Sequence, residues 1–293
     1  MGLGNDMMRY EAPETTKAAV KLLTGSRGRT RILAGGTDLL VQMRSGMAEP
    51  ALVVDIKHIA AMGAIKREAG GFRIGAAVPS AELGEHAGLV KAWPGVVEAA
   101  GLIGSTQIQG RATIVGNLCN GSPAADSVPA MIVAGARARI AGPGRRRDLP
   151  VEKVVVGPGK TALKKGELIE SIFLPKPPAR SGDAYLRFIP RTEMDIAAAS
   201  AGVFLTLDRK GICTDARVAI GAVGPRAILV KPAAKALIGT PLDEAALTDL
   251  AAACSAAARP IDDKRGTKEF RTHVVGVLAR RAAVIALKRA KGE

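Results

Sequence analysis

The chain has 293 residues, of which 47% are hydrophobic, so it is long enough to bury a core in one large domain or two modest ones. No apolar run approaches the ~20 residues of a membrane-spanning helix, and the N-terminus lacks the basic and apolar segments of an export signal, which favours a cytoplasmic protein without a membrane span. The formal charge of +15 raises nucleic acid as a partner, but the basic residues are dispersed and aromatic residues make up only 3%.

The cysteines and histidines are too few and too scattered to predict a disulfide framework or a metal cluster. They lie far apart in the sequence: Cys119, Cys213, Cys254, His58, His86 and His273. We therefore expect no metal on this chain, and any redox chemistry here needs an organic cofactor.

The first 60 residues predict a helix and two strands around a glycine turn. Apolar positions in residues 10–24 recur at helical spacing. Ile32-Leu33 end a short buried strand, Gly35-Gly36 form a turn, and a helix or extended segment starts at Asp38. Residues 51–58 predict a second buried strand.

The next segment predicts strands and helices that serve as scaffold. Residues 72–84 predict a strand, a turn at Pro79 and a helix capped by Ser80. A further helix is expected near 95–102, and residues 105–110 predict a polar loop.

The stretch from Thr113 to Ala136 places small and amide-bearing residues directly before a predicted helix start. Gly116, Asn117 and Gly121 precede Ser122-Pro123, where serine can cap free N–H groups and proline fits the first turn. Glycines let the backbone approach a ligand closely, and a helix N-terminus attracts an anion. The pattern is compatible with a phosphate site and equally with an ordinary capped helix.

The glycine turn near the N-terminus is a second candidate loop for a phosphate. Its sequence, AGGTDL at 34–39, fits neither GxGxxG nor GxxxxGK[ST], which excludes Rossmann and P-loop sites. Asp38 would repel a bare phosphate and fits better as a cap or as an acceptor from sugar hydroxyls. No Ser/His/Asp arrangement, HExxH motif or convincing carboxylate pair is present, so no catalytic residue is predicted.

The second half of the chain predicts a separate α+β layer. Residues 137–156 alternate as strands around a turn at 142–144, and the proline-rich residues 175–182 form the clearest linker, because proline stops both helix and strand pairing. Beyond it we expect three antiparallel strands and two helices on one side of the sheet: 184–190, 201–208, 216–224, 243–258 and 267–290.

Together these stretches resemble the FAD-binding (medium) subunits of the molybdenum hydroxylases, of the carbon monoxide dehydrogenase and xanthine dehydrogenase type. The resemblance covers nearly the whole chain and rests on motifs in the family's order: AGGTDL at 34–39, TIVGN at 113–117, SPAAD at 122–126, GPGKTAL at 157–163, GELIESIFLP at 166–175, RTEMDIAAAS at 191–200 and DDKRGTKEFRTHVV at 262–275.

The resemblance implies an α+β fold with two domains. Residues 1–176 would form a two-lobed PCMH-type FAD-binding domain, with lobes at about 1–58 and 59–176. Residues 183–290 would form a C-terminal α+β domain of the CO dehydrogenase flavoprotein type, built on the three-stranded antiparallel sheet.

The resemblance also implies the residues that bind FAD. Ser122 and Asp126 would contact the phosphate and the ribityl or ribose hydroxyls, and Ile169 would line the adenine or ring cavity. Cys119 fits as a small filler and no histidine lies in either loop, so FAD is expected to be non-covalent. The pyrophosphate would be held by two loops: Ile32, Leu33, Ala34, Gly35, Gly36, Thr37, Asp38, Leu39, Thr113, Ile114, Val115, Gly116 and Asn117.

Several positions depart from the family pattern. Arg187 stands where many relatives have a lysine near the flavin, and arginine cannot lose its proton. Ile196 stands where carbon monoxide dehydrogenase relatives carry a tyrosine, so we expect it to pack on the flavin and leave the ring more open. Ile103 replaces an aromatic residue of xanthine dehydrogenases, and Gly157-Pro158-Gly159 lacks a preceding aromatic pair, which argues against NAD as the acceptor.

The resemblance therefore implies an FAD-carrying electron-transfer subunit of a multi-subunit molybdenum hydroxylase. Molybdopterin would reside on a large partner subunit and [2Fe–2S] clusters on a small one, in a dimer of heterotrimers, and FAD would pass the electrons to an external acceptor. Two alternatives stay open: a stand-alone PCMH- or MurB-type flavin oxidoreductase, which would need its own acid–base groups, and a basic nucleic-acid-binding protein, which would lack a flavin spectrum.

Overall fold

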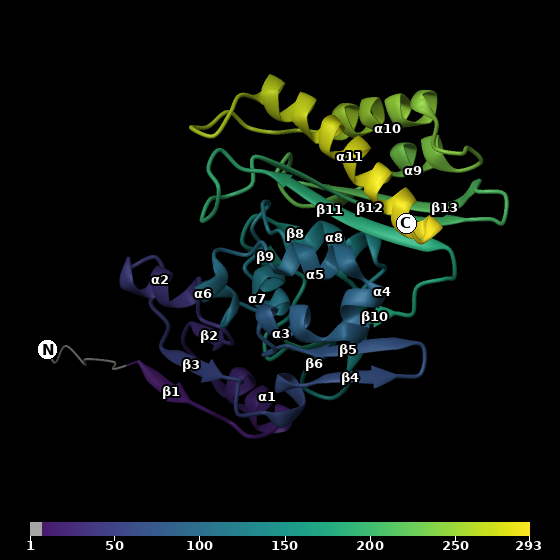
Figure 1. The fold of residues 1–293 in the computed structure, drawn as a ribbon. Helices are drawn as coiled ribbons and strands as arrows, with labels where there is room; N and C mark the ends of the chain where they lie inside the picture. Colours follow the sequence, from purple (N-terminus) through teal and green to yellow (C-terminus); the bar gives the residue numbers. More distant parts are fainter. Residues whose placement is uncertain (1–7) are drawn as a thin grey trace, which may run out of the picture.

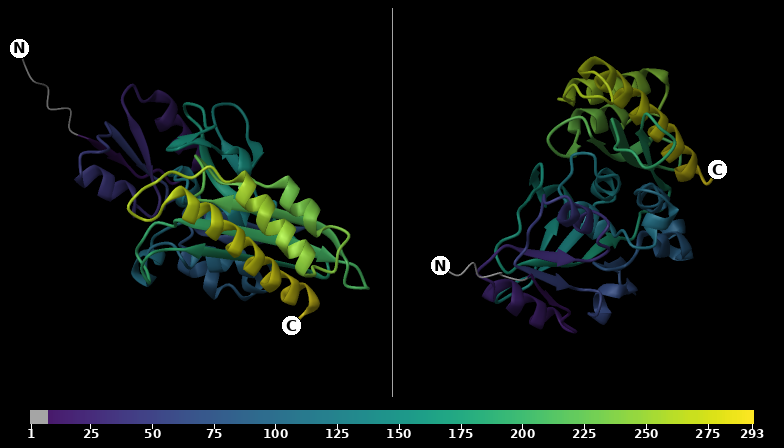
Figure 2. Two further views of the ribbon diagram at one scale, coloured as in Figure 1. Left: turned by 90° about the horizontal axis from the view of Figure 1, so that it is seen from above. Right: turned by 90° about the vertical axis from the view of Figure 1, so that its left-hand side faces the viewer.

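The computed structural model describes residues 8–293, which form an N-terminal part with two larger sheets and a two-stranded β8-β9 sheet, and a C-terminal part with one sheet and a layer of helices (Figure 1). Figure 2 shows the C-terminal layer lying across the N-terminal part, with its helices on the outer side. Residues 1–7, with which the predicted first lobe begins, lie outside the described residues. Within residues 8–293, no helix combines the length and apolarity that a bilayer crossing requires.

A short parallel sheet in the order β1-β3-β2 forms the first lobe. The predicted helix and both predicted strands are confirmed, and every residue of the central strand β3 is buried. The strand β2, which was predicted to be buried, is only partly buried because it lies at the edge of the sheet. Thr15 caps α1 by accepting a hydrogen bond from Ala18 N at 3.2 Å. The elements are β1 (Arg9–Glu11), α1 (Thr16–Gly25), β2 (Thr30–Leu33), α2 (Leu39–Arg44) and β3 (Leu52–Asp55).

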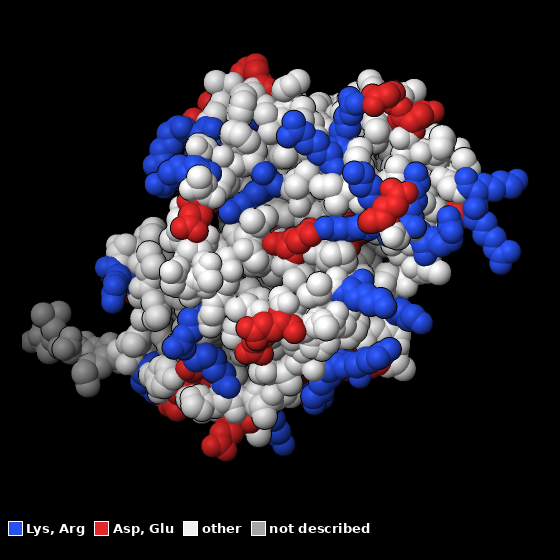
Figure 3. All heavy atoms as spheres, viewed as in Figure 1, with Lys and Arg blue, Asp and Glu red and all other residues white. Residues whose placement is uncertain are grey.

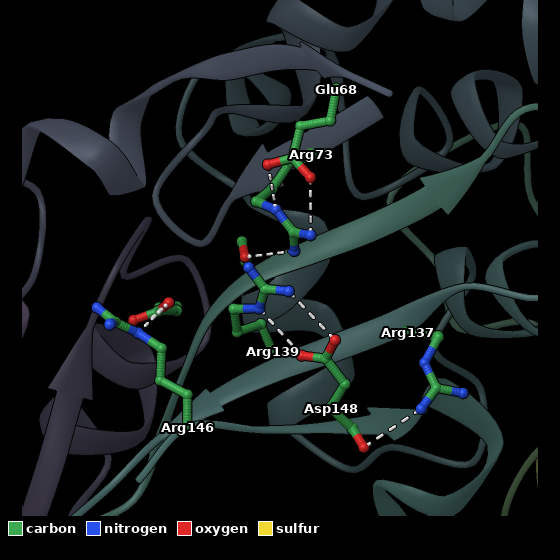
Figure 4. A network of polar contacts seen from close by, with 8 residues as sticks. Glu68, Arg73, Arg137, Arg139, Arg146 and Asp148 are labelled. Atoms are coloured by element: carbon green, nitrogen blue, oxygen red, sulfur yellow. Dashed lines mark hydrogen bonds and ion pairs between the residues drawn. The ribbon is translucent and has the colours of Figure 1, made fainter. Parts of the chain in front are cut away.

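The second sheet is antiparallel and has the order β4-β5-β10-β6-β7. One face buries alternate residues such as Ile74, and the other carries cross-strand ion pairs, shown in Figure 4. Arg73 Nε lies 2.6 Å from Glu68 Oε1, and Arg139 Nε lies 3.0 Å from Asp148 Oδ1. The strands are β4 (Ile65–Glu68), β5 (Gly71–Gly75), β6 (Arg137–Ala141), β7 (Arg147–Pro150) and β10 (Leu168–Pro175).

Short helices connect these strands and fill the second lobe. The polar loop expected at 105–110 is wrong, because residues 106–109 form one helical turn. At the predicted helix near residue 80, Pro79 occupies the cap position and Ser80 is the first helical residue. The remaining elements are two 3₁₀ helices (Ala60–Gly63 and Val151–Lys153), α3 (Ser80–Glu85), α4 (Ala87–Ala92), α5 (Pro94–Ala100), α6 (Thr106–Gln109), α7 (Ile114–Cys119), α8 (Ser127–Val133), β8 (Val155–Gly157) and β9 (Lys160–Thr161).

The helix predicted to start at Ser122 is also wrong. Ser122 Oγ accepts a hydrogen bond from Ala124 N at 3.2 Å and closes a turn, and α8 begins only at Ser127. The helix start in this stretch lies earlier, because Thr113 Oγ1 accepts a hydrogen bond from Gly116 N at 2.8 Å and caps α7. The motif TIVGN is therefore a capped helical turn.

The C-terminal sheet is antiparallel and has the order β11-β12-β13-β14. The predicted α+β class, the three strands and both long helices are confirmed, while the two-residue strand β14 and the helix α9 are additional. The bounds are β11 (Ser181–Phe188), β12 (Ala199–Leu207), β13 (Cys213–Gly221), β14 (Ile228–Leu229), α9 (Lys231–Leu237), α10 (Glu244–Ala257) and α11 (Lys268–Lys291).

Strand β11 has one face in each of two hydrophobic cores. Ala184, Leu186 and Phe188 pack with the C-terminal helices. On the other face, Tyr185 belongs to the core of the N-terminal part, where α5 and α8 contact the sheet. Asp183 shares this face and lies against α5, because a Cβ on Gly95 would stand 2.6 Å from Asp183 Oδ2. The C-terminal sheet thus completes the core of the second lobe.

Candidate functional site

A cavity of about 740 Å³ lies between the two lobes of the N-terminal part. Its walls come from β2 and α2 on one side, α7 on the second, and the stretch from β9 to β10 on the third. A cavity of this size suits a nucleotide-sized ligand. Most of the predicted site residues line it: Ile32, Ala34, Gly35, Gly36, Thr37, Asp38, Leu39, Thr113, Val115, Gly116, Asn117 and Ile169.

The two predicted loops meet backbone to backbone at Gly35. A Cβ on this residue would stand 1.9 Å from Arg111 O and 3.1 Å from Ala112 Cα. Gly36 has φ of 80°, in the left-handed region that glycine tolerates, and it turns the chain from β2 into α2. The AGG sequence therefore lets the first loop close directly onto the segment that leads to α7.

Polar side chains tie the lobes together across the cavity wall. Asn120 Nδ2 donates to Asp38 Oδ1 at 3.2 Å, and Gln42 Nε2 donates to Asn120 Oδ1 at 3.1 Å. Asp38 makes no capping hydrogen bond to α2, and its burial raises the pKa of the carboxyl. Asp38 is thus free of the cap role and is available as a hydrogen-bond acceptor in the cavity.

Cationic side chains outnumber free carboxylates in the cavity wall. Arg27, Arg31, Lys164 and Lys165 all line it, while Glu167 is neutralised by a partner arginine outside the lining. Lys and Arg also outnumber Asp and Glu in the chain as a whole, 42 to 27, and Figure 3 shows them distributed over both parts of the molecule. The cavity wall therefore favours an anionic ligand.

Six predicted site residues do not line the cavity: Leu33, Ile114, Ser122, Asp126, Arg187 and Ile196. Leu33 ends β2 and Ile114 is fully buried in α7, so both lie beside the lining. Ile196 follows β11 on a surface loop and is 53% exposed.

Asp126 and Arg187, which were predicted as separate contacts, pair with each other. Arg187 Nη1 donates to Asp126 Oδ2 at 2.6 Å, and Tyr185 Oη donates to Asp126 Oδ1 at 2.9 Å. Burial raises the pKa of Asp126 to about 6, although Arg187 and Tyr185 lower it, so the carboxylate is ionised at pH 7.

Several lining residues were missed by sequence reasoning. Lys164 and Lys165 lie between two motifs that carried the resemblance, GPGKTAL and GELIES, and that position was the available signal. Asn120 and Gln42 carried no signal, because their contact joins residues 78 positions apart. Cys119 also lines the cavity, and burial raises the pKa of its thiol to about 12.

The cavity lining combines apolar side chains with glycines and cations, as a dinucleotide needs. Apolar residues that can pack on an aromatic base line one part, including Leu23, Ile56, Leu163 and Ile169. The glycine turn and the cations suit a pyrophosphate. This site, between two lobes and under a C-terminal α+β layer, defines the class as a two-lobed nucleotide-binding protein.

Comparison with known proteins identifies the family. Residues 6–177 match the family described as FAD binding domain in molybdopterin dehydrogenase, and residues 184–285 match the CO dehydrogenase flavoprotein C-terminal domain. The chain belongs to this family of molybdopterin-dehydrogenase FAD-binding subunits. It is an oxidoreductase subunit whose cofactor is FAD.

Individual relatives align over almost their full length. The carbon monoxide dehydrogenase medium chain of Afipia carboxidovorans is 35% identical over 96% of this chain and 97% of its own. The xanthine dehydrogenase FAD-binding subunit of Escherichia coli O157:H7 is 29% identical over 98% and 99%, respectively. The solved structure of reconstituted CO dehydrogenase from Oligotropha carboxidovorans superposes with a TM-score of 0.91 at 33% identity, covering 99% of this chain and 100% of that one. The first two relatives are named as a chain and a subunit of larger enzymes.

Proposed function

We propose that this chain carries FAD as the electron-transfer subunit of a multi-subunit molybdenum hydroxylase. The observation that carries the proposal is that residues of the AGGTDL and TIVGN loops line the same cavity. The chain also covers 97% of a carbon monoxide dehydrogenase medium chain. A large molybdopterin subunit would oxidise the substrate, and a small [2Fe–2S] subunit would deliver the electrons to this chain. The three subunits would assemble as a dimer of heterotrimers in the cytoplasm, and nucleic acid would not be a partner. When bound, FAD would supply two-electron redox chemistry between the iron–sulfur subunit and an external acceptor.

The chain's own residues bind and orient the cofactor. Gly35 and Gly36 let the backbone approach the pyrophosphate, and Thr113 holds the first turn of α7 so that Gly116 faces the same cavity. Asp38 accepts from sugar hydroxyls, because its carboxylate does not cap α2.

Two positions lie toward the flavin ring in this proposal. Ser122 closes the turn that follows α7 and borders the ribityl chain. Ile196, on the exposed loop after β11, borders the ring's open edge, where isoleucine covers less of the flavin than tyrosine would.

The test is to purify the chain, measure its flavin content and assay it alone. We expect one FAD per chain, reduction by dithionite, reoxidation by dioxygen or a quinone, and no turnover of aromatic, purine or aldehyde substrates. Turnover by the isolated chain would instead support a stand-alone oxidoreductase. Salt-sensitive retention of nucleic acid without flavin would support the nucleic-acid alternative.

A further inference from the structure

The segment that follows the TIVGN turn rests on the C-terminal sheet. Ala222 N, at the end of β13, donates to Pro123 O at 2.8 Å. A Cβ on Gly202 of β12 would stand 3.0 Å from Pro129 O, so the sheet approaches the start of α8 closely. Residues 122–129 therefore have little freedom to move independently of β12 and β13.

A buried polar network extends this contact to the cavity. Asn117 lines the cavity, and its Oδ1 accepts hydrogen bonds from Ser127 N at 3.2 Å and Ser127 Oγ at 2.7 Å. The adjacent Asp126 accepts from Tyr185 Oη at 2.9 Å and from Arg187 Nη1 at 2.6 Å. Because Asp126 and Ser127 are consecutive residues, these hydrogen bonds connect Tyr185 and Arg187 of β11 to Asn117 at the cavity without a gap.

Burial makes this network costly to disturb. The Arg187 and Asp126 side chains are only 6% and 10% exposed, and Ser127 is completely buried. Removing either charge leaves the other without a charged partner in a poorly hydrated site, and removing the Tyr185 hydroxyl takes one donor from the carboxylate. The segment must then shift to compensate, and Asn117 shifts with it.

We infer that Tyr185 and Arg187 are positioning residues for FAD, which they hold in place through Asp126, Ser127 and Asn117 without lining its cavity. The C-terminal sheet is thus part of the cofactor site, although none of its residues contributes to the lining. This inference rests on the proposed function, because it requires that the cavity bind FAD.

The same strand supplies a matched control. Asp183 lies on the face of β11 that carries Tyr185 and Arg187 and is as buried as Tyr185, but its carboxylate lies against Gly95 of α5 and makes no hydrogen bond to Asp126, Ser127 or Asn117. A change at Asp183 alters the contact between the two parts of the protein without entering the network.

The experiment titrates FAD into the apo forms of the full chain and its variants Tyr185→Phe, Arg187→Met and Asp183→Asn, with flavin fluorescence as readout at pH 7.5. We expect Tyr185→Phe to raise the Kd by about fivefold, the equivalent of one hydrogen bond. Arg187→Met should raise it more than tenfold, and Asp183→Asn should leave it unchanged. Amide exchange over residues 113–121 should accelerate in Tyr185→Phe, which removes one oxygen atom and keeps the test valid if Arg187→Met does not fold.

Two results would overturn the inference. One is an unchanged Kd in Tyr185→Phe and Arg187→Met together with lowered melting temperatures, which would make the network purely structural. The other is an equal loss of affinity in Asp183→Asn, which would assign the effect to the interface in general. Failure of the wild-type chain to bind FAD would contradict the proposed function instead.

Discussion

A single methyl group at Gly35 should separate the two loops that form the cavity. In Gly35→Ala the new Cβ would stand 1.9 Å from Arg111 O. Because Cβ atoms essentially never approach a neighbour closer than 3.0 Å, one of the two loops must move by about 1 Å. The obstacle is backbone on both sides, which no rotamer change relieves. Overpacking of this kind costs about 1–3 kcal/mol, and we expect about 2 kcal/mol of it as lost binding, a rise in the Kd for FAD of roughly 30-fold.

The assay is a fluorescence titration of the apo protein with FAD, together with thermal unfolding of the apo form. Gly25→Ala is the control, because a Cβ there, in the same lobe, meets nothing within 4 Å. We expect the control to bind FAD like the wild type. If Gly35→Ala also binds with the wild-type Kd while both variants are folded, the close contact at Arg111 does not shape the FAD site.

Three further outcomes are expected. Burial raises the pKa of Asp183 to about 7 from 3.8, so the folded protein takes up a proton before the unfolded chain does and becomes more stable as pH falls. Between pH 8 and pH 5 the wild type should therefore gain about 2–3 kcal/mol of unfolding free energy relative to Asp183→Asn in urea denaturation, and equal gains would refute the assignment. Acid precipitation should release all flavin, because a Cys119 thiol with a pKa of about 12 is not nucleophilic at pH 7, and colour in the pellet would show a covalent link. Ile196→Tyr should shift the visible flavin spectrum and slow reoxidation by dioxygen at unchanged FAD content, and an unaltered spectrum and rate would place Ile196 away from the ring.

The sequence predicted the parts of the fold that local chemistry determines. Apolar periodicity located α1, alanine-rich composition located α10, and prolines located the segment between β10 and β11. The errors occurred where a contact distant in sequence overrides local preference. Ser122-Pro123 has the composition of a helix start, but Pro123 O is engaged by Ala222 N, and the chain turns there before α8 begins.

The cavity was predictable to a similar degree. Glycine-rich loops can be recognised from their composition. Twelve of the predicted site residues, most of them in these loops, line the cavity. Asp126 and Arg187 could not be paired in advance, because they lie 61 positions apart and each carries its own plausible role as a ligand contact. Lys164 and Lys165 have the composition of any solvated turn, and their position between the GPGKTAL and GELIES motifs was the one sequence signal for a place at the cavity.

The two faces of β11 give the linker before it an unexpected property. The chain between Pro177 and Arg180 separates two sequence segments, yet the strand that follows supplies Tyr185 to one core and Leu186 to the other. Proteolysis of that linker would sever the polypeptide without dividing the packed interior. The fragments would remain associated and would melt in one cooperative transition. The proline-rich linker therefore separates two sequence segments that unfold together.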